Sequence, residues 1–135
     1  MSIVLGFDGR DSSRRALPVA IDLARDLGLE LVLVCGVRPP GSVGEEFQEV
    51  EAAIAEMDAP ALAEGVESAR AAGVTACGVL LDALPADALL DVAVERNARL
   101  IVVGYGEAGR IRAALSGAVA LRLLERTDVP LLVVP

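Results

Sequence analysis

The stretch Ser2–Val37, with the sequence SIVLGFDGRDSSRRALPVAIDLARDLGLELVLVCGV, decides the fold class. Short apolar runs, typical of buried strands, stand at its two ends as Ser2–Asp8 and Glu30–Val37. Between them, apolar side chains recur at helical spacing on one face: Leu17, Ala20, Ile21, Ala24 and Leu27. The stretch therefore predicts a strand, a helix and a second strand that runs parallel to the first.

The ends of this first helix can be predicted from single residues. Asp11 or Ser12 is expected to cap its N-terminus, and Gly28 is expected to end it. Pro18 lies inside the helix, where it removes a backbone donor and crowds the preceding turn. We therefore expect a kink at Pro18.

The same alternation of strands and helices continues along the sequence. Three more apolar runs, Val74–Leu81, Leu100–Gly104 and Pro130–Val134, predict strands. Gly73 and Asn97 are expected to end the helices that precede two of these strands. Because helices join successive strands through right-handed crossovers, the sequence predicts a three-layer α/β sandwich with a five-stranded parallel sheet.

The residues between the second and third predicted strands contain several breaks. Arg38–Gly44 is rich in proline and glycine and is expected to be a loop. Further on, the sequence Asp58-Ala-Pro60 predicts two helical pieces, of which the second is capped by Asp58 and has Pro60 in its first turn. The helix before the fourth strand is expected to begin near Pro85, without an aspartate cap.

Length and composition indicate one domain, residues 1–135, that is large enough to bury its own core. Although 54% of the residues are hydrophobic, no apolar run reaches the roughly 18 residues of a membrane span. The first residues lack the pattern of a secretory signal. We therefore expect a soluble, cytoplasmic protein with no membrane partner.

The charged residues exclude several classes of function. A formal net charge of −8 makes nucleic acid an unexpected partner. The sequence contains neither lysine nor histidine, so it lacks Schiff-base chemistry, the P-loop lysine and the commonest general base. Cys35 and Cys77 each lie in an apolar run, without a second cysteine at metal-binding spacing, and are expected in the core. No catalytic residue and no metal site is predicted.

Ligands of such sheets bind beyond the carboxyl ends of the strands. The two loops with the most suitable residues are Phe7–Arg15, FDGRDSSRR, after the first strand and Gly104–Arg112, GYGEAGRIR, after the fourth. If the two strands are neighbours, these loops face each other. As an alternative, four carboxylates of this edge could gather around Mg²⁺ or Mn²⁺: Asp8, Asp11, Asp82 and Glu107.

These segments together resemble the universal stress protein family. The resemblance rests on the order and spacing of six pieces along nearly the whole chain: Asp8-Gly9, Ser13-x-Arg15-Ala-Leu17, LVCGV, IVVG at Ile101–Gly104, Gly117-x-Val119 and the final VPLLVVP. It implies a Rossmann-like sheet of the adenine nucleotide alpha hydrolase type, with strand order 3-2-1-4-5. It also implies a homodimer in which the last strands pair antiparallel and cover the apolar edge LLVV.

In nucleotide-binding members of that family the fourth-strand loop carries glycine, two residues, glycine, nine residues, glycine and a serine or threonine. Gly104 and Gly117 match the first and third glycines, whereas Glu107 and Ala118 replace the second glycine and the hydroxyl residue. A glycine there lets the backbone approach phosphate oxygens, and the hydroxyl donates to them. The resemblance thus implies weak or absent ATP binding.

Other residues of the same loop favour a bound nucleotide. Gly106 and Gly109 flank the glutamate and allow another backbone path, while Arg110 can pair with a phosphate. Ser116 can cap the last helix or reach a phosphate. The same features also fit an ordinary turn, a solvated helix face and a cap.

The adenosine-contacting positions of the family match better. Asp8 is available to the sugar or base, and Val37 to the adenine; Asp8 also fits a turn residue that binds its own backbone. Two functions remain open. The first is a non-enzymatic, dimeric stress-response or regulatory protein with weak or absent ATP binding. The second is a protein that binds ATP or AMP with Mg²⁺ between the two loops, with slow hydrolysis left open.

Overall fold

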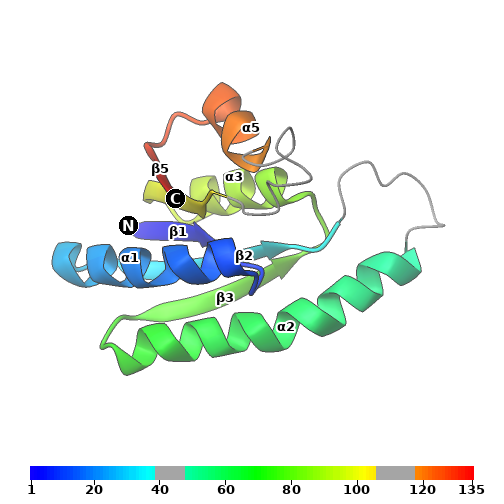
Figure 1. Ribbon diagram of the computed structural model, residues 1–135. Helices are drawn as coiled ribbons and strands as arrows, with labels where there is room; N and C mark the ends of the chain where they lie inside the picture. The colour runs from blue at the N-terminus through cyan, green and yellow to red at the C-terminus, as the bar shows by residue number, and fades with distance from the viewer. Residues whose placement is uncertain (39–47, 106–117) are drawn as a thin grey trace.

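The computed structural model of the chain describes residues 1–38, 48–105 and 118–135 (Figure 1). Strands and helices alternate along the described segments, as the sequence predicts. In chain order they are β1 (Ser2–Gly6), α1 (Asp11–Leu27), β2 (Glu30–Gly36), α2 (Gln48–Ala71), β3 (Ala76–Leu81), α3 (Pro85–Glu95), β4 (Ala98–Gly104), α5 (Ala118–Arg126) and β5 (Leu131–Val134).

The five strands form one parallel sheet of order β3-β2-β1-β4-β5. Helices α1 and α2 cover one face, and α3 and α5 cover the other (Figure 1). The predicted three-layer α/β sandwich, Rossmann-like and of order 3-2-1-4-5, is therefore confirmed. Strand β1 is central, so the loop that follows it lies between the ends of β2 and β4.

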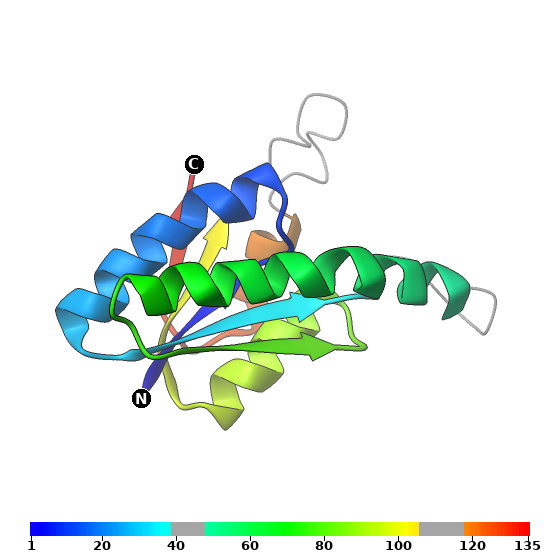
Figure 2. The same cartoon turned by 90° about the horizontal axis from the view of Figure 1, so that it is seen from below.

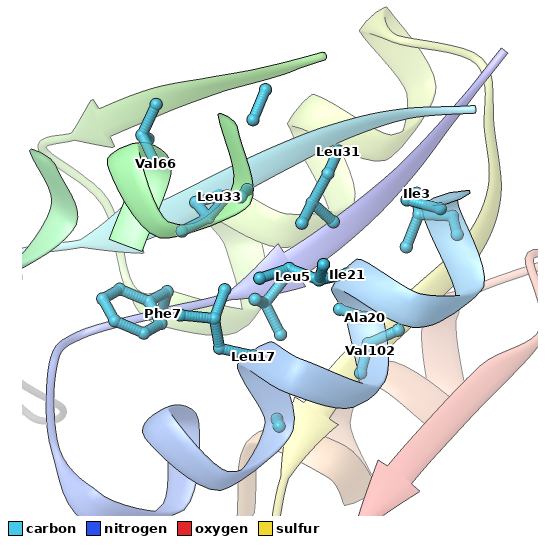
Figure 3. Close-up of a cluster of buried hydrophobic side chains, with 14 of the residues drawn as sticks. Ile3, Leu5, Phe7, Leu17, Ala20, Ile21, Leu31, Leu33, Val66 and Val102 are labelled. Carbon is cyan, nitrogen blue, oxygen red and sulfur yellow. The ribbon is translucent and has the colours of Figure 1, made fainter. Parts of the chain in front are cut away.

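Alternate side chains of the strands build two cores. On the α1/α2 side, Leu5 of β1 and Phe7, just after this strand, pack with Leu17 of α1 and Leu33 of β2, as Figure 3 shows. On the opposite side, the intervening residues of the strands pack on α3 and α5, among them Val4, Val32, Val34 and Ile101. Because both faces of the sheet are covered, the strands are continuous apolar runs rather than alternating ones.

The ends of the elements differ from the predicted ones by one or two residues in most strands. Strand β1 ends at Gly6, before Asp8, and β4 begins earlier than expected, at Ala98. Helix α3 begins at Pro85, with Leu84 as its N-cap residue and no capping side chain, as expected. Asn97 follows this helix with a φ of 51°.

Helix α1 confirms its predicted end but not its predicted cap. Gly28 ends the helix in the left-handed conformation, with a φ of 67°. Arg10 rather than Asp11 or Ser12 is the N-cap residue, and it makes no side-chain capping bond. The helix continues through Pro18, which is exposed to solvent; the kink at this residue stays a prediction.

The two helical pieces predicted around Pro60 are wrong, because α2 is a single helix of 24 residues. Its inward face holds Leu62, Val66 and Ala69 against the sheet. A methyl group added at Gly65 would lie 2.8 Å from Leu33 Cδ2, so the helix approaches β2 closely. This packing outweighs the local cost of a helical proline. Asp58 is consequently not a cap: it lies within α2 and is buried.

Strand β3 forms one edge of the sheet, and its outer side is partly covered by a side chain of α2. The backbone N–H groups of Leu31 and Val37 donate to the carbonyls of Thr75 and Leu81. The carbonyls of odd-numbered residues from 75 to 81 therefore face β2, and those of even-numbered residues face away from it. The carbonyl of Ala76 faces outward and accepts a hydrogen bond of 3.1 Å from Arg70 Nε.

The two cysteines are free thiols. Cys35 is buried in the core, as predicted, whereas Cys77 is only half-buried, beside Glu30 and Arg96. In the described part of the chain, no helix is long and apolar enough to cross a membrane.

Candidate functional site

The carboxyl ends of β1, β2 and β4 bring three of the predicted site residues to one edge of the sheet. Asp8 follows β1, Val37 follows β2, and Gly104 ends β4. Because β1 pairs with both of its neighbours, the carboxyl ends of β1 and β4 are adjacent, as the two-loop hypothesis requires. This edge is the candidate site.

Asp8 is held by its own loop. Its Oδ1 accepts hydrogen bonds from the backbone N–H of Arg10 at 2.9 Å and from Ser13 Oγ at 3.0 Å. Its Oδ2 forms an ion pair of 2.8 Å with the Arg10 guanidinium. An ionised carboxylate has about four acceptor sites, so these three bonds leave one of them for a ligand. The turn role of Asp8 is therefore real and does not occupy the whole side chain.

Ser13 organises the backbone of this loop from the first turn of α1. Its hydroxyl, which is buried, accepts hydrogen bonds from the N–H of Asp8 at 3.4 Å and of Gly9 at 3.1 Å, and lies 2.9 Å from the carbonyl of Arg10. Gly9 has a φ of 83°, which only glycine adopts without strain. The loop shape is thus fixed by one hydroxyl and one glycine.

Gly104 is required by packing. A methyl group added there would lie 2.2 Å from the carbonyl oxygen of Ser12, so any side chain would collide with the backbone of α1. The end of β4 consequently lies directly against the first turn of α1. Arg15 of that helix donates to the carbonyl of Tyr105 at 3.3 Å, which ties the same two segments together.

Val37 offers less backbone to a ligand than its position suggests. Its side chain is buried, and its N–H donates to the carbonyl of Leu81 at 3.0 Å. The next N–H, of Arg38, donates to Ala83 at 3.1 Å. The end of β2 is therefore engaged with the end of β3, and both of these backbone donors are already used.

The remaining predicted site residues lie outside the described residues. These are Gly106, Gly109, Arg110, Ser116 and Gly117, together with Glu107, on which the ATP prediction depends. Ala118, the residue in place of the motif hydroxyl, is the first residue of α5.

The acidic alternative gains no support from the residues that the structure places. Asp82 pairs with Arg38 at 3.2 Å, and Asp11 lies exposed in the first turn of α1. Within residues 1–38, 48–105 and 118–135, no group of three His, Cys, Asp or Glu side chains is arranged to hold a metal ion. Glu107 lies outside these ranges.

Sequence reasoning missed a buried carboxyl beside the site. The Cys35 thiol donates to Asp58 Oδ2 at 3.4 Å, and only 4% of Asp58 is exposed to solvent. Burial raises the pKa of Asp58, and burial together with the charge of Asp58 raises the pKa of Cys35 to about 12. The available signal was spacing, because Asp58 lies four residues before Leu62 and eight before Val66 on the apolar face of α2.

Comparisons with known proteins agree with the fold and show which ligands two similar proteins bind. A family model described as the universal stress protein family matches residues 1–135. A universal stress protein of Thermus aquaticus, named for its place in the 3′ region of the QAH/OAS sulfhydrylase gene, is 31% identical, over 98% of this chain and 97% of its own length.

Two similar solved structures contain adenine nucleotides. A universal stress protein in complex with cAMP is 28% identical, with a TM-score of 0.73, and the match covers 100% of this chain and 96% of that one. The universal stress protein of Archaeoglobus fulgidus in complex with dAMP is 26% identical, also with a TM-score of 0.73, over 100% of this chain and 98% of that one.

Proposed function

Because this chain belongs to the universal stress protein family, we propose that it is a non-enzymatic stress-response or regulatory protein. It acts as a homodimer in the cytoplasm, as a single domain over residues 1–135, and it binds ATP weakly or not at all. The observation that carries the proposal is the family match over the full chain, combined with Glu107 and Ala118 at two positions of the nucleotide motif.

The low ATP affinity follows from charge and from a lost donor. A carboxylate about 4 Å from a phosphate costs on the order of 1 kcal/mol in water and several times more in a partly dry site. Alanine in place of serine or threonine removes a hydroxyl that donates to a phosphate oxygen. Isothermal titration calorimetry with Mg-ATP tests this proposal directly. We expect no micromolar binding, and a micromolar dissociation constant would overturn it.

A second candidate function is binding of an adenine mononucleotide such as AMP. The cAMP and dAMP complexes of the two relatives favour it, because each of these ligands has a single phosphate. A single phosphate requires fewer contacts from the altered loop after β4 than three phosphates do. Mass spectrometry of protein purified under native conditions would reveal a retained nucleotide, and AMP titration would measure its affinity.

The described residues fit the sugar and base of such a ligand. Asp8 keeps one acceptor site that a ribose hydroxyl can use, and Val37 supplies an apolar wall. Gly104, together with Gly106, Gly109, Arg110, Ser116 and Gly117 of the following loop, is proposed to hold the phosphate. Magnesium, when bound, would neutralise phosphate charge, and Arg110 could do so as well.

The proposed dimer uses the edge strand β5. All four residues of this strand are partly exposed, and the neighbouring helix α5 exposes Leu121 and Leu124 at 61% each. Antiparallel pairing of two β5 strands about a two-fold axis would satisfy the open backbone groups and bury this apolar surface.

A further inference from the structure

An open groove of roughly 390 Å³ lies between helix α2 and the edge strand β3. Its floor is apolar where the two elements meet: a methyl group added at Gly78 would lie 3.1 Å from Leu62 Cγ and 3.2 Å from Val66 Cγ2. Ala59 and Ala63, both exposed, form the wall on the α2 side. An exposed apolar groove is typical of surfaces that bind another molecule.

The α2–β3 groove exists because α2 leaves the outer side of β3 uncovered. A methyl group added at Gly65 would lie 2.8 Å from Leu33 Cδ2 and 2.9 Å from Phe7 Cε1, so this turn of α2 lies over β2 and the end of β1. Figure 2 shows α2 running along β2 and β3. Leu80 follows Gly78 by two residues, so it shares the α2 side of β3, yet it is 38% exposed. Leu80 therefore extends the apolar surface of the groove along the strand.

The polar groups beside the groove are mostly acceptors. The carbonyls of Gly78 and Leu80 face away from β2, and no described residue donates a hydrogen bond to them. Glu67 lines the groove, and Glu56, eleven residues earlier, lies on the same side of α2; both are exposed. Carboxylates and open carbonyls match the donors of lysine and arginine side chains. The groove is therefore complementary to a partner that is both apolar and basic.

The shape of the groove favours a helix over an extended strand. Arg70 Nε donates to the carbonyl of Ala76 at 3.1 Å, so a strand that paired along β3 would first have to displace this side chain. A helix makes its backbone hydrogen bonds internally and needs none from β3. The small side chains of Ala59 and Ala63 also let a second helix come close to α2.

We propose that the α2–β3 groove binds a basic amphipathic helix of a partner protein. The apolar face of that helix lies on Leu62, Val66 and Leu80, and its lysine or arginine side chains reach the carboxylates and the open carbonyls. The formal net charge of −8 favours the approach of a basic partner over that of a second copy of this chain. This role goes beyond the proposed function and does not depend on a bound nucleotide.

The test is fluorescence anisotropy of a labelled synthetic peptide that is titrated with the folded full chain. The probe is a peptide of about 18 residues, made of leucine and lysine, with the leucines at helical spacing on one face. Three comparison peptides separate the possible causes of binding. One has the same composition in an order without an apolar face, one has glutamate in place of lysine, and one carries a central proline that breaks the helix.

Two variants and two matched controls locate the binding surface. Ala63→Phe fills the groove from an exposed position, and Ala53→Phe makes the same change at an exposed alanine of α2 that does not line the groove. Glu67→Gln removes a carboxylate beside the groove, and Glu95→Gln removes an exposed carboxylate of α3, on the other face of the sheet.

We expect Ala63→Phe to weaken binding of the leucine–lysine peptide by about tenfold or more, because it occupies the space that the leucines would fill. Glu67→Gln should weaken binding by about twofold to threefold at low salt, and by less at high salt. The two controls should change the affinity by less than about twofold, and the three comparison peptides should bind at least about tenfold more weakly.

Several results would overturn the proposal. Equal binding of the peptide without an apolar face would show bare charge attraction, and equal binding of the proline peptide would show an extended occupant. Equal effects of Ala63→Phe and Ala53→Phe would place the peptide elsewhere, and binding of no peptide would leave the groove without this partner.

A second copy of the chain is the remaining occupant to test. Sedimentation velocity without peptide measures it: a lower mass for Ala63→Phe than for the unchanged protein would put a second copy in the groove and overturn the proposal. Circular dichroism checks that each variant is folded. Should Ala63→Phe fail to fold, Ala63→Lys, whose amine reaches solvent, takes its place with Ala53→Lys as its control, and equal peptide affinities of these two variants would contradict the assignment.

Discussion

The sulfur of Cys35 lies 3.4 Å from Oδ2 of Asp58, and this contact joins β2 to α2 beside the candidate site. Both groups are buried and both favour their protonated forms, since burial raises the pKa of each. Two weakly acidic groups thus share one hydrogen bond beside the carboxyl ends of β1 and β2.

Asp58 makes stability depend on pH in a defined direction. Its pKa is raised above the ordinary value of 3.8, so its stabilising contribution is complete below pH 3.8 and is lost as pH rises through the folded-state pKa. Asp58→Asn cannot ionise. The difference in free energy of unfolding between this variant and the unchanged protein should therefore grow in favour of the variant from pH 4 to pH 7. Urea denaturation at both pH values measures it, and an equal difference for Asp58→Asn at the two values would contradict the assignment. Asp91→Asn serves as the exposed control.

Gly104→Ala should destabilise the protein by about 1–3 kcal/mol, because the added methyl would meet the backbone carbonyl of Ser12. Gly6→Ala is the matched control at the end of β1: its methyl would lie 3.3 Å from a terminal carbon of Leu89, which can move. Chemical denaturation should rank Gly104→Ala well below Gly6→Ala in stability. Equal losses would show that α1 can shift away from β4.

Ser13→Ala should cost about 1–2 kcal/mol, because it leaves the N–H groups of Asp8 and Gly9 without the hydroxyl that accepts from them. Ser12→Ala, at the neighbouring half-buried position, should cost less. Thermal unfolding of both variants compares them. If Ser13→Ala and Ser12→Ala have the same melting temperature, the hydrogen bonds of Ser13 do not hold the loop.

Restoring the nucleotide motif should restore ATP binding. The double variant Glu107→Gly/Ala118→Ser is expected to bind Mg-ATP at least about tenfold more tightly, since it removes a like charge and adds a hydroxyl donor, each contributing about 1 kcal/mol. Glu125→Gln removes one acidic charge on the exposed side of α5 and should leave affinity unchanged. No gain in the double variant, measured by calorimetry, would show that another feature limits ATP binding.

Val133→Pro should separate the proposed dimer. The backbone N–H groups of Ile101 and Tyr105 donate to the carbonyls of Pro130 and Val134. The backbone groups of even-numbered residues from 130 to 134 therefore face β4. Leu131 and Val133 therefore direct their backbone groups to the open edge, and proline at 133 removes an outward donor. Light scattering should give the mass of one chain, with circular dichroism unchanged. A folded Val133→Pro variant that stays dimeric would exclude this edge as the interface.

The fold was predictable because its signals are local and mutually consistent. Apolar runs, with glycine or asparagine stops before several of them, predicted each strand, and the family resemblance supplied the strand order. Helix α2 was predicted wrongly because Pro60 is a strong local break, whereas the packing of Leu62, Val66 and Ala69 on the sheet comes from distant residues. Propensity alone does not contain that contribution.

The site was predictable where position in the chain fixes position in space. Asp8 and Val37 follow strands and Gly104 ends one, so a parallel sheet must bring them to one edge. Asp58 was interpreted as a cap because aspartate before proline usually is one. Its burial follows from its place on the apolar face of α2, four residues before Leu62, and this spacing has meaning only when α2 is taken as one unbroken helix.

The Arg70 guanidinium is bound to the outward carbonyl of Ala76, so the edge strand β3 is less able than the edge strand β5 to pair with a strand of another chain. A neighbouring strand that docked on β3 would have to displace this cation first. Two chains joined at β5 would form a ten-stranded sheet with an arginine at each end (5 strands from each chain). Neither outer edge of such a sheet would readily add another strand, so pairing through β5 would give a dimer and not a fibre.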